Sequence, residues 1–207
     1  EVFPERPNVA LLAAAFTAFL PQFLFMSAAV SNDIVVAATA SWVVVLLARS
    51  VQRGFVWQRS AALGVLVGLA ALSKLSGLVV LAPVGLALLY WSLRERRGKD
   101  ALRNGLIVLA TAVAVAGWWY ARNWALYGDP LGMQTMLDVA GRREAFGLSD
   151  LLFELEGLRL SFWGLFGWFN VLMAGWAYAV YDVLALVGLG GLAVLVARKA
   201  LARSGNR

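Results

Sequence analysis

Long runs of apolar residues, separated by short polar segments, give the chain six stretches that are able to cross a membrane. These runs cover residues 8–30, 34–48, 61–72, 78–91, 105–119 and 178–197. A bilayer core about 30 Å thick needs about 20 mostly apolar residues in a helix, and polytopic bundles also contain shorter spans. The pattern therefore predicts an all-α fold, a polytopic bundle of about six transmembrane helices.

Two of these runs contain features that shape the predicted helices. Pro21 lies inside the first run and predicts a kink there, because proline interrupts helical hydrogen bonding. Lys74 lies between the third and fourth runs, within the polar segment 73–77. A lysine at the centre of a single span would cost about 2.5–3.5 kcal/mol on insertion scales. We therefore predict two short helices that meet at a turn and place Lys74 at the membrane surface.

The segment 122–177 is too long for a plain connection between two spans. Residues 127–130 predict a turn, since glycine, aspartate and proline all favour turns. Residues 150–160 predict an amphipathic helix, and the aromatic and glycine-rich run 161–170 is expected to lie along the membrane face or dip into it. The chain thus divides into transmembrane helices in 1–121, an external amphipathic and aromatic segment in 122–177, and a last transmembrane helix with a basic tail in 178–207.

Basic residues gather in three regions, 49–59, 94–103 and 198–207, which fall on the same side of the predicted bundle. Lysine and arginine accumulate on the cytoplasmic side of membrane proteins. We therefore expect a multi-pass plasma-membrane protein whose C-terminus is cytoplasmic. Residues 31–33, Lys74 and the segment after Tyr120 then lie on the external side.

Composition supports this class and excludes several others. Hydrophobic residues make up 61% of the 207 residues and charged residues only 14%, whereas soluble domains have about 25% charged residues. The chain has no cysteine and no histidine, which excludes disulfides, thiolate metal sites and histidine-dependent nucleophiles. The net charge of +6 resides in the short clusters between apolar runs, so we expect membrane lipid and no nucleic acid as a partner.

Two polar positions at the expected external turns are open to two interpretations each. Asp33, which follows Asn32, either caps the next helix through its side chain or serves as a carboxylate that binds a metal ion or a sugar hydroxyl. Lys74 either reaches the lipid headgroups along its aliphatic stem or binds the anion of a phosphate-bearing lipid.

The end of the fifth run adds further candidates. Trp119 and Arg122 either form an aromatic belt with an interfacial arginine, or Arg122 contacts phosphate and the tryptophan packs on a sugar or prenyl chain. Asp129 is the acidic residue that the predicted turn constrains most. The aromatic residues Trp163, Trp168 and Phe169 are either structural or able to stack on sugars. None of these residues identifies a function by itself.

Several segments resemble the GT-C membrane glycosyltransferases, the group that includes protein O-mannosyltransferases and lipid A aminoarabinose transferases. Residues 20–23 followed by 31–33 resemble the third and fourth helices of that group, and 64–83 is similar to its paired short helices with a turn lysine. The runs 122–132 and 161–168 resemble an uncharacterised bacterial branch of the group. The resemblance covers most of the chain, and the last two motifs are the most specific.

The resemblance implies a transferase that takes a sugar from a polyprenyl-phosphate donor on the external face. It implies that Asp33 binds a divalent metal ion or shapes the site, that Lys74 meets the donor phosphate, and that Arg122 does so more weakly. Members carry a catalytic acid in a loop after their first helix, and Asn8 would begin about the third helix of a full member. The chain is therefore expected to be an inactive piece of a longer enzyme, with no catalytic residue identified within it.

Two other functions are consistent with the residues alone. A transporter or lipid flippase would also be polytopic, although such folds place charges at the membrane midplane and often contain inverted repeats. A membrane scaffold without catalysis would not need Asp33 or Lys74.

Overall fold

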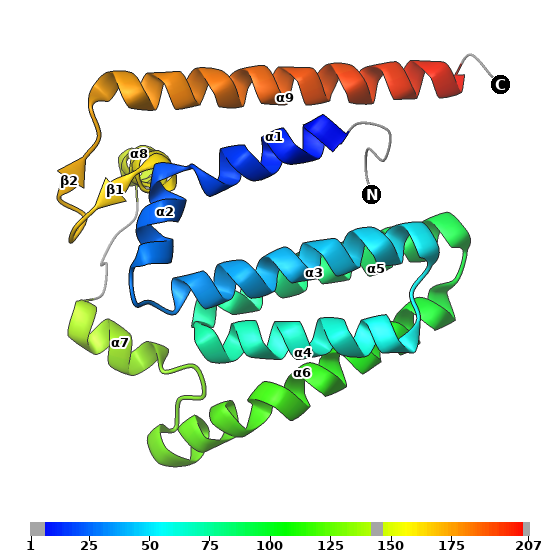
Figure 1. Cartoon of the computed structure of the whole chain (residues 1–207). Coiled ribbons are helices and arrows are strands. Elements are labelled where there is room, and N and C mark those ends of the chain that lie inside the picture. The colour runs from blue at the N-terminus through cyan, green and yellow to red at the C-terminus, as the bar shows by residue number, and fades with distance from the viewer. Residues whose placement is uncertain (1–6, 142–146, 205–207) are drawn as a thin grey trace. The chain divides into compact units, whose positions relative to one another are not determined.

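The computed structural model describes residues 7–141 and 147–204, and these form two compact units (Figure 1). The first unit contains residues 7–13 and 26–141 of this set, and the second contains 14–25 and 147–204. The helices are α1 (Pro7–Ala18), α2 (Pro21–Ala28), α3 (Asp33–Arg53), α4 (Trp57–Ser73), the 3-10 helix η1 (Leu75–Val80), α5 (Leu81–Glu95), α6 (Gly98–Tyr127), α7 (Met133–Ala140), α8 (Leu148–Trp163) and α9 (Gly175–Ser204). Two short strands, β1 (Leu165–Phe166) and β2 (Val171–Leu172), pair antiparallel.

The all-α, membrane-spanning fold class is confirmed, and most of the about six predicted spans are long apolar helices. Among the described residues, four helices are long and apolar enough to cross a membrane: α3, η1 continued by α5, α6, and α9. The pair α1 and α2 adds a fifth if it forms one span; the two helices meet at an angle of 61°. The break lies directly before Pro21, as predicted, because a proline is best tolerated at the start of a helix. The sixth predicted span is α4, whose 17 residues are fewer than in those four helices, although it runs between the same two ends of the bundle as α3.

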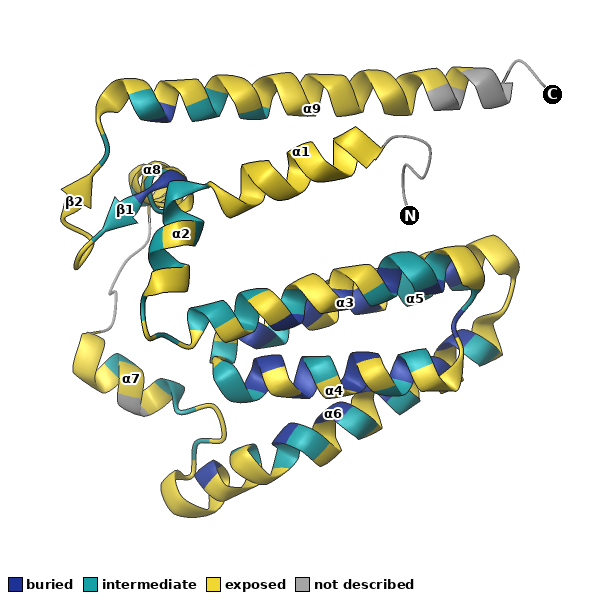
Figure 2. Cartoon of the chain, viewed as in Figure 1, coloured by how far each residue is buried: buried dark blue, intermediate teal, exposed yellow. Residues whose placement is uncertain are grey.

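In the first unit, α3, α4, α5 and α6 form a four-helix bundle. Contacts run from α3 to α4, from α4 to α6, from α6 to α5 and back to α3. Helix α4 carries many buried positions (Figure 2), and its Leu63, Val67 and Ala70 are at most 1% exposed. The outer surfaces of these helices remain apolar and exposed, as at Val44, Leu86 and Val113. Such a surface is expected where lipid covers the protein.

Helices α4 and α6 approach closely because α4 presents two glycines to α6. A Cβ atom at Gly64 would lie 2.5 Å from the carbonyl oxygen of Val108, and one at Gly68 would lie 2.7 Å from the Cβ of Val115. Without a hydrophobic driving force between helices in lipid, such close contact of small residues is a main source of helix association. The two glycines therefore set the spacing of the bundle.

A buried polar pair also joins α4 to α6, and it gives a testable stability effect. The hydroxyl of Ser60 donates a hydrogen bond to Oδ1 of Asn104 at 2.8 Å, and both residues are fully buried. Inter-helix hydrogen bonds in membranes contribute about 0.6 kcal/mol on average and about 1.7 kcal/mol at most. We expect Asn104→Ala to lower the unfolding free energy by about that range, as measured by unfolding of the purified protein. The variant Ser41→Ala is the matched control, since Ser41 is exposed and its hydroxyl bonds only within its own helix; an equal loss in both variants would contradict the assignment.

The second unit holds α8, the β1–β2 hairpin and α9 together through a small aromatic and polar cluster. The carboxylate of Asp182 on α9 accepts hydrogen bonds from Arg159 at 2.6 and 2.8 Å and from the indole of Trp163 at 2.9 Å. Trp163 also stacks on Tyr181, with 5.2 Å between ring centroids. Within the aromatic and glycine-rich run 161–170, α8 continues to Trp163 and the hairpin begins at Leu165, and α8 begins at Leu148, close to the predicted helix start.

Candidate functional site

In the bundle of the first unit, charged and polar side chains gather at two opposite ends. Helix α3 begins at Asp33 and ends at Arg53, whereas α4 begins near that arginine and ends at Ser73. Helices α5 and α6 meet at the same end as Arg53, since Trp91 of α5 packs on Phe55 with 5.3 Å between ring centroids. The two arginine-rich loops of this unit therefore share one end, as predicted for them, and the placement of the third basic region, 198–207 in the second unit, stays a prediction. The opposite end holds Asp33, Lys74 and the last turns of α6.

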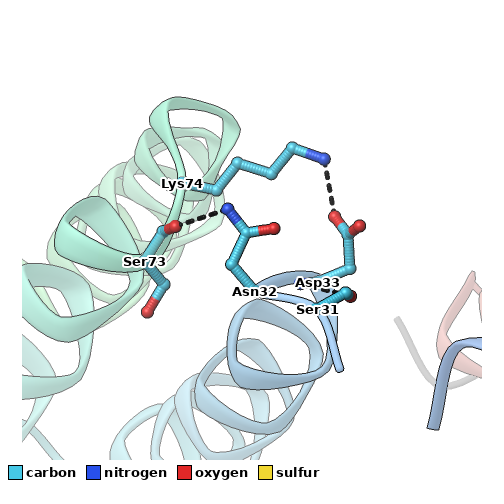
Figure 3. Close-up of polar contacts among 5 residues, drawn as sticks. All are labelled: Ser31, Asn32, Asp33, Ser73 and Lys74. Atoms are coloured by element: carbon cyan, nitrogen blue, oxygen red, sulfur yellow. Dashed lines mark hydrogen bonds and ion pairs between the residues drawn. The ribbon is translucent and has the colours of Figure 1, made fainter. Parts of the chain in front are cut away.

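At this second end, Asp33 and Lys74 form an ion pair that the sequence did not reveal (Figure 3). The Nζ atom of Lys74 lies 2.6 Å from Oδ1 of Asp33. A second contact joins the same two turns, because Nδ2 of Asn32 donates a hydrogen bond to the carbonyl oxygen of Ser73 at 2.9 Å. Residues 41 positions apart in the sequence are thus held side by side by two independent polar contacts.

Local backbone structure explains why both side chains are available at this end. Helix α4 stops at Ser73 because Lys74 is extended, with φ −160° and ψ 145°. Gly77 then allows η1 to fold against the end of α4, since a Cβ atom there would overlap the carbonyl oxygen of Ala70. On the other turn, the hydroxyl of Ser31 accepts a hydrogen bond from the backbone N–H of Asp33 at 3.1 Å. The predicted turn at Lys74 is therefore confirmed.

The Asp33 side chain contacts Lys74 and does not cap helix α3. Asp33 is the first residue of α3, and Asn32 at the N-cap position forms no side-chain cap hydrogen bond. A carboxylate in the first helical turn still interacts favourably with the positive end of the helix. The carboxylate itself is directed to Lys74.

The Asp33–Lys74 pair is exposed enough to exchange partners. The Lys74 side chain is 44% exposed and the Asp33 side chain 37% exposed. Ion pairs of this exposure contribute only about 0–1 kcal/mol, because water screens the charges and two side chains lose freedom. A ligand with a stronger negative charge is therefore able to take over the ammonium group of Lys74.

A cavity of about 400 Å³ lies at the same end of the bundle, along the last turns of α6. Its lining consists of Trp119, Arg122, Asn123, Tyr127 and Gly132. The guanidinium carbon of Arg122 lies 5.3 Å from the ring centroid of Trp119, which is within the range of a cation–π contact. Helix α6 continues to Tyr127, so Arg122 lies on the helix itself. Its forked donors are thus held over an aromatic surface at the rim of an open cavity.

Tyr120 connects this part of α6 to the turn that carries Lys74. Its hydroxyl donates a hydrogen bond to the carbonyl oxygen of Ala71 at 2.8 Å, and Ala71 precedes Lys74 by three residues. Tyr120 and Asn123, which is buried and lines the cavity, were not singled out from the sequence. A tyrosine and an asparagine beside an interfacial arginine give no distinctive signal before the neighbouring helix is known.

Asp129 has a structural role in the turn between α6 and α7. One carboxylate oxygen accepts a hydrogen bond from the N–H of Leu131 at 3.1 Å, and the other accepts from the N–H of Gln134 at 2.7 Å. These bonds satisfy backbone donors at the start of α7. The binding of substrate by Asp129 stays a prediction, and the turn predicted at this position is confirmed.

A metal ion at Asp33 would find few other protein ligands. Within residues 7–141 and 147–204, no three side chains of histidine, cysteine, aspartate or glutamate gather closely enough to hold a metal. Divalent cations such as Mg²⁺ and Ca²⁺ favour several oxygen ligands, whereas an ammonium group already occupies the Asp33 carboxylate. The metal on Asp33 stays a prediction, and the chemistry proposed below uses none.

Asp182 is a structural residue that the sequence analysis did not single out. It lies inside the last apolar run and binds Arg159 and Trp163 of α8. An acidic residue within a spanning segment is a signal of a functional or structural partner. In this chain its partners tie α8 to the start of α9.

Comparison with known proteins gives one result. Residues 3–120 match the family described as dolichyl-phosphate-mannose-protein mannosyltransferase. This range includes α1 to α5, most of α6, and therefore both Asp33 and Lys74. No curated protein and no solved structure matches the chain.

Proposed function

From the premise that this chain belongs to the dolichyl-phosphate-mannose-protein mannosyltransferase family, we propose that it forms the donor-binding part of a membrane glycosyltransferase. In this proposal the donor is a sugar linked to a polyprenyl phosphate, and the transfer takes place on the external face of the plasma membrane. The arginine-rich end of the bundle then faces the cytoplasm, and the end with Lys74 faces outward. The observation that carries the proposal is the half-exposed cation of Lys74 at the end of the bundle opposite the basic loops.

In this proposal, Lys74 and Arg122 both bind the donor phosphate, each with a different geometry. Lysine presents a compact positive charge, whereas the guanidinium group of arginine matches two phosphate oxygens at once. During transfer, the bond between the sugar's anomeric carbon and the phosphate oxygen breaks, and a bond to the acceptor oxygen forms. Negative charge then grows on the departing polyprenyl phosphate, where a fixed cation stabilises it. The proton of the acceptor hydroxyl passes to a base that is not assigned within the described residues.

In this proposal, donor binding also changes the partner of the Asp33 carboxylate. A sugar phosphate competes with the Asp33 carboxylate for Lys74, and the existing ion pair is weak enough to be replaced. Its carboxylate then becomes free to accept hydrogen bonds from sugar hydroxyls beside the phosphate. Asn32, whose amide joins the two turns through Ser73, keeps the pair of turns together during this exchange.

Consumption of a radiolabelled polyprenyl-phosphate sugar by the full-length protein that contains this chain, inserted in lipid vesicles, tests the proposed activity. Loss of the labelled donor that depends on the protein supports a transferase. If no sugar donor is consumed while the folded protein is inserted in the vesicles, the proposed transfer is wrong. Substrate movement across vesicles without chemical change would favour a transporter instead.

The exchange at Lys74 makes a separate prediction for Asp33→Asn. This variant keeps the side-chain shape but removes the competing charge, so we expect polyprenyl phosphate to bind about two- to fivefold more tightly, the equivalent of an exposed ion pair. Equilibrium binding of labelled polyprenyl phosphate gives the measurement. Asp100→Asn is the control, because Asp100 forms its ion pairs with Arg97 and Arg103 at the other end of the bundle. Weaker binding in Asp33→Asn would show that the carboxylate supports the anion instead of competing with it.

A further inference from the structure

The tip of the β1–β2 hairpin carries two strongly exposed aromatic side chains of the second unit. Trp168 is 93% exposed and Phe169 is 77% exposed. Both lie in the four-residue loop that connects Phe166 to Val171, the last pair of the ladder. No charged residue occurs between positions 164 and 181. The hairpin therefore presents an uncharged tip with two exposed aromatic rings.

Phe169 at this tip has a strained backbone conformation. Phe169 has φ +61°, in the left-handed region, which is unfavourable for a bulky side chain and is usually occupied by glycine or asparagine. Gly167 takes φ +63° in the same loop, and Oδ1 of Asn170 accepts a hydrogen bond from the N–H of Trp168 at 3.0 Å. A strained residue that persists in a loop points to a use for its side chain.

The base of the hairpin is held firmly, in contrast to its tip. The N–H of Leu165 donates a hydrogen bond to Oε1 of Gln22 at 2.8 Å, and Phe166 packs against Phe25 with 5.3 Å between ring centroids. The buried hydroxyl of Tyr178 bonds to the carbonyl oxygen of Gly164 and accepts from the N–H of Met173. The tip is thus presented on a rigid support, which lowers the entropy lost when it binds.

We propose that the tip formed by Trp168 and Phe169 inserts into the lipid bilayer at the interface and anchors the second unit there. Only Met173 and Ala174 separate β2 from α9, a helix apolar enough to span the membrane, so the hairpin lies at the level where that helix enters the bilayer. Trp176, 74% exposed in the first turn of α9, continues the apolar surface from the tip to the span. Tryptophan rings favour this interfacial level. The inference concerns lipid contact alone and does not depend on the proposed sugar transfer.

The absence of cysteine from the chain allows a direct test. Trp168→Cys and Phe169→Cys, each carrying a nitroxide label, are compared in phosphatidylcholine vesicles for collisions with oxygen, which concentrates in lipid, and with a water-soluble nickel chelate. Leu189→Cys in the middle of α9 serves as the lipid reference, and Lys99→Cys at the exposed start of α6 serves as the water reference. We expect both tip labels to be accessible to oxygen and protected from nickel, as at Leu189→Cys.

Nickel accessibility equal to that of Lys99→Cys would overturn the proposal and place the tip in water. Protection from both reagents would also overturn it, since protein or another ligand would then cover the tip. A second measurement guards against distortion by the label. Brominated phosphatidylcholine should quench the wild-type tryptophan fluorescence more strongly than that of Trp168→Phe, and equal fractional quenching of the two proteins would argue against insertion.

Discussion

Replacing Lys74 with alanine is expected to reduce sugar transfer by about 10²–10³-fold, the range found when a single preorganised group that stabilises developing charge is removed. The lysine is the half-exposed cation at the bundle end that carries Asp33, and its positive charge opposes the charge that grows on the departing phosphate. The rate of donor consumption in vesicles, at saturating and limiting donor, gives the measurement. A fall in kcat at saturating donor would show that Lys74 acts during transfer as well as during binding.

Three control measurements separate an effect on sugar transfer from an effect on folding in Lys74→Ala. Lys74→Arg should retain part of the activity, because a cation remains at the turn although its shape differs. Arg94→Ala, at the opposite end of the bundle, should leave turnover unchanged. Membrane insertion and size-exclusion behaviour should match the wild type, since Lys74 contributes only an exposed ion pair to the fold. Undiminished turnover in Lys74→Ala would remove Lys74 from the proposed mechanism.

Substituting alanine at Gly64 or Gly68 is expected to lower the unfolding free energy by on the order of 1–3 kcal/mol, the usual cost of excess volume in a packed interior. The added Cβ at Gly64 would meet the carbonyl oxygen of Val108 at 2.5 Å, and backbone cannot move aside as a side chain can. The added Cβ at Gly68 would meet Val115 at 2.7 Å. Helices α4 and α6 would have to separate, and the hydrogen bond between Ser60 and Asn104 would lengthen with them.

Gly85→Ala is the matched control for these variants. Gly85 lies within α5, and a Cβ atom there has no neighbour within 4 Å, so alanine should be neutral or slightly stabilising through its higher helix propensity. Thermal unfolding of the three variants in the same detergent gives the comparison. Equal midpoints for Gly68→Ala and Gly85→Ala would mean that α4 and α6 do not pack closely in the protein.

The sequence indicated the Lys74 turn and the Pro21 break because both depend on local chemistry. A charge inside an apolar run must reach a surface, and a proline cannot continue a helix without losing a hydrogen bond. The alternation of basic loops was also predictable, because it requires only the order of spans along the chain. The length of α4 was less predictable: its apolar run covers only 12 positions in the sequence, and only the structure shows a 17-residue helix that runs between the same two ends of the bundle as α3.

Other features depend on pairs of residues that are far apart in the chain. Gly64 and Gly68 stand four positions apart, a spacing that favours close helix contact, yet nothing in the sequence identifies α6 as the partner. The left-handed conformation of Phe169 is likewise imposed by the hairpin, since its own side chain disfavours it. The helix contact and the left-handed residue both depend on how the backbone segments of a unit pack against one another.

The sequence by itself therefore determined that this protein is a membrane helix bundle with Asp33, Lys74 and Arg122 at the end opposite the basic loops. Apolar run length and the placement of charges follow from the energy of transferring each segment into lipid, which is a local property. Only the tertiary structure decided that Lys74 is paired with Asp33, that Asp129 binds backbone N–H groups, and that Asp182 joins α8 to α9. Each of these contacts requires two backbone segments to approach within hydrogen-bond distance, and that approach is determined by the packing of helices around small residues such as Gly64, Gly68 and Gly77.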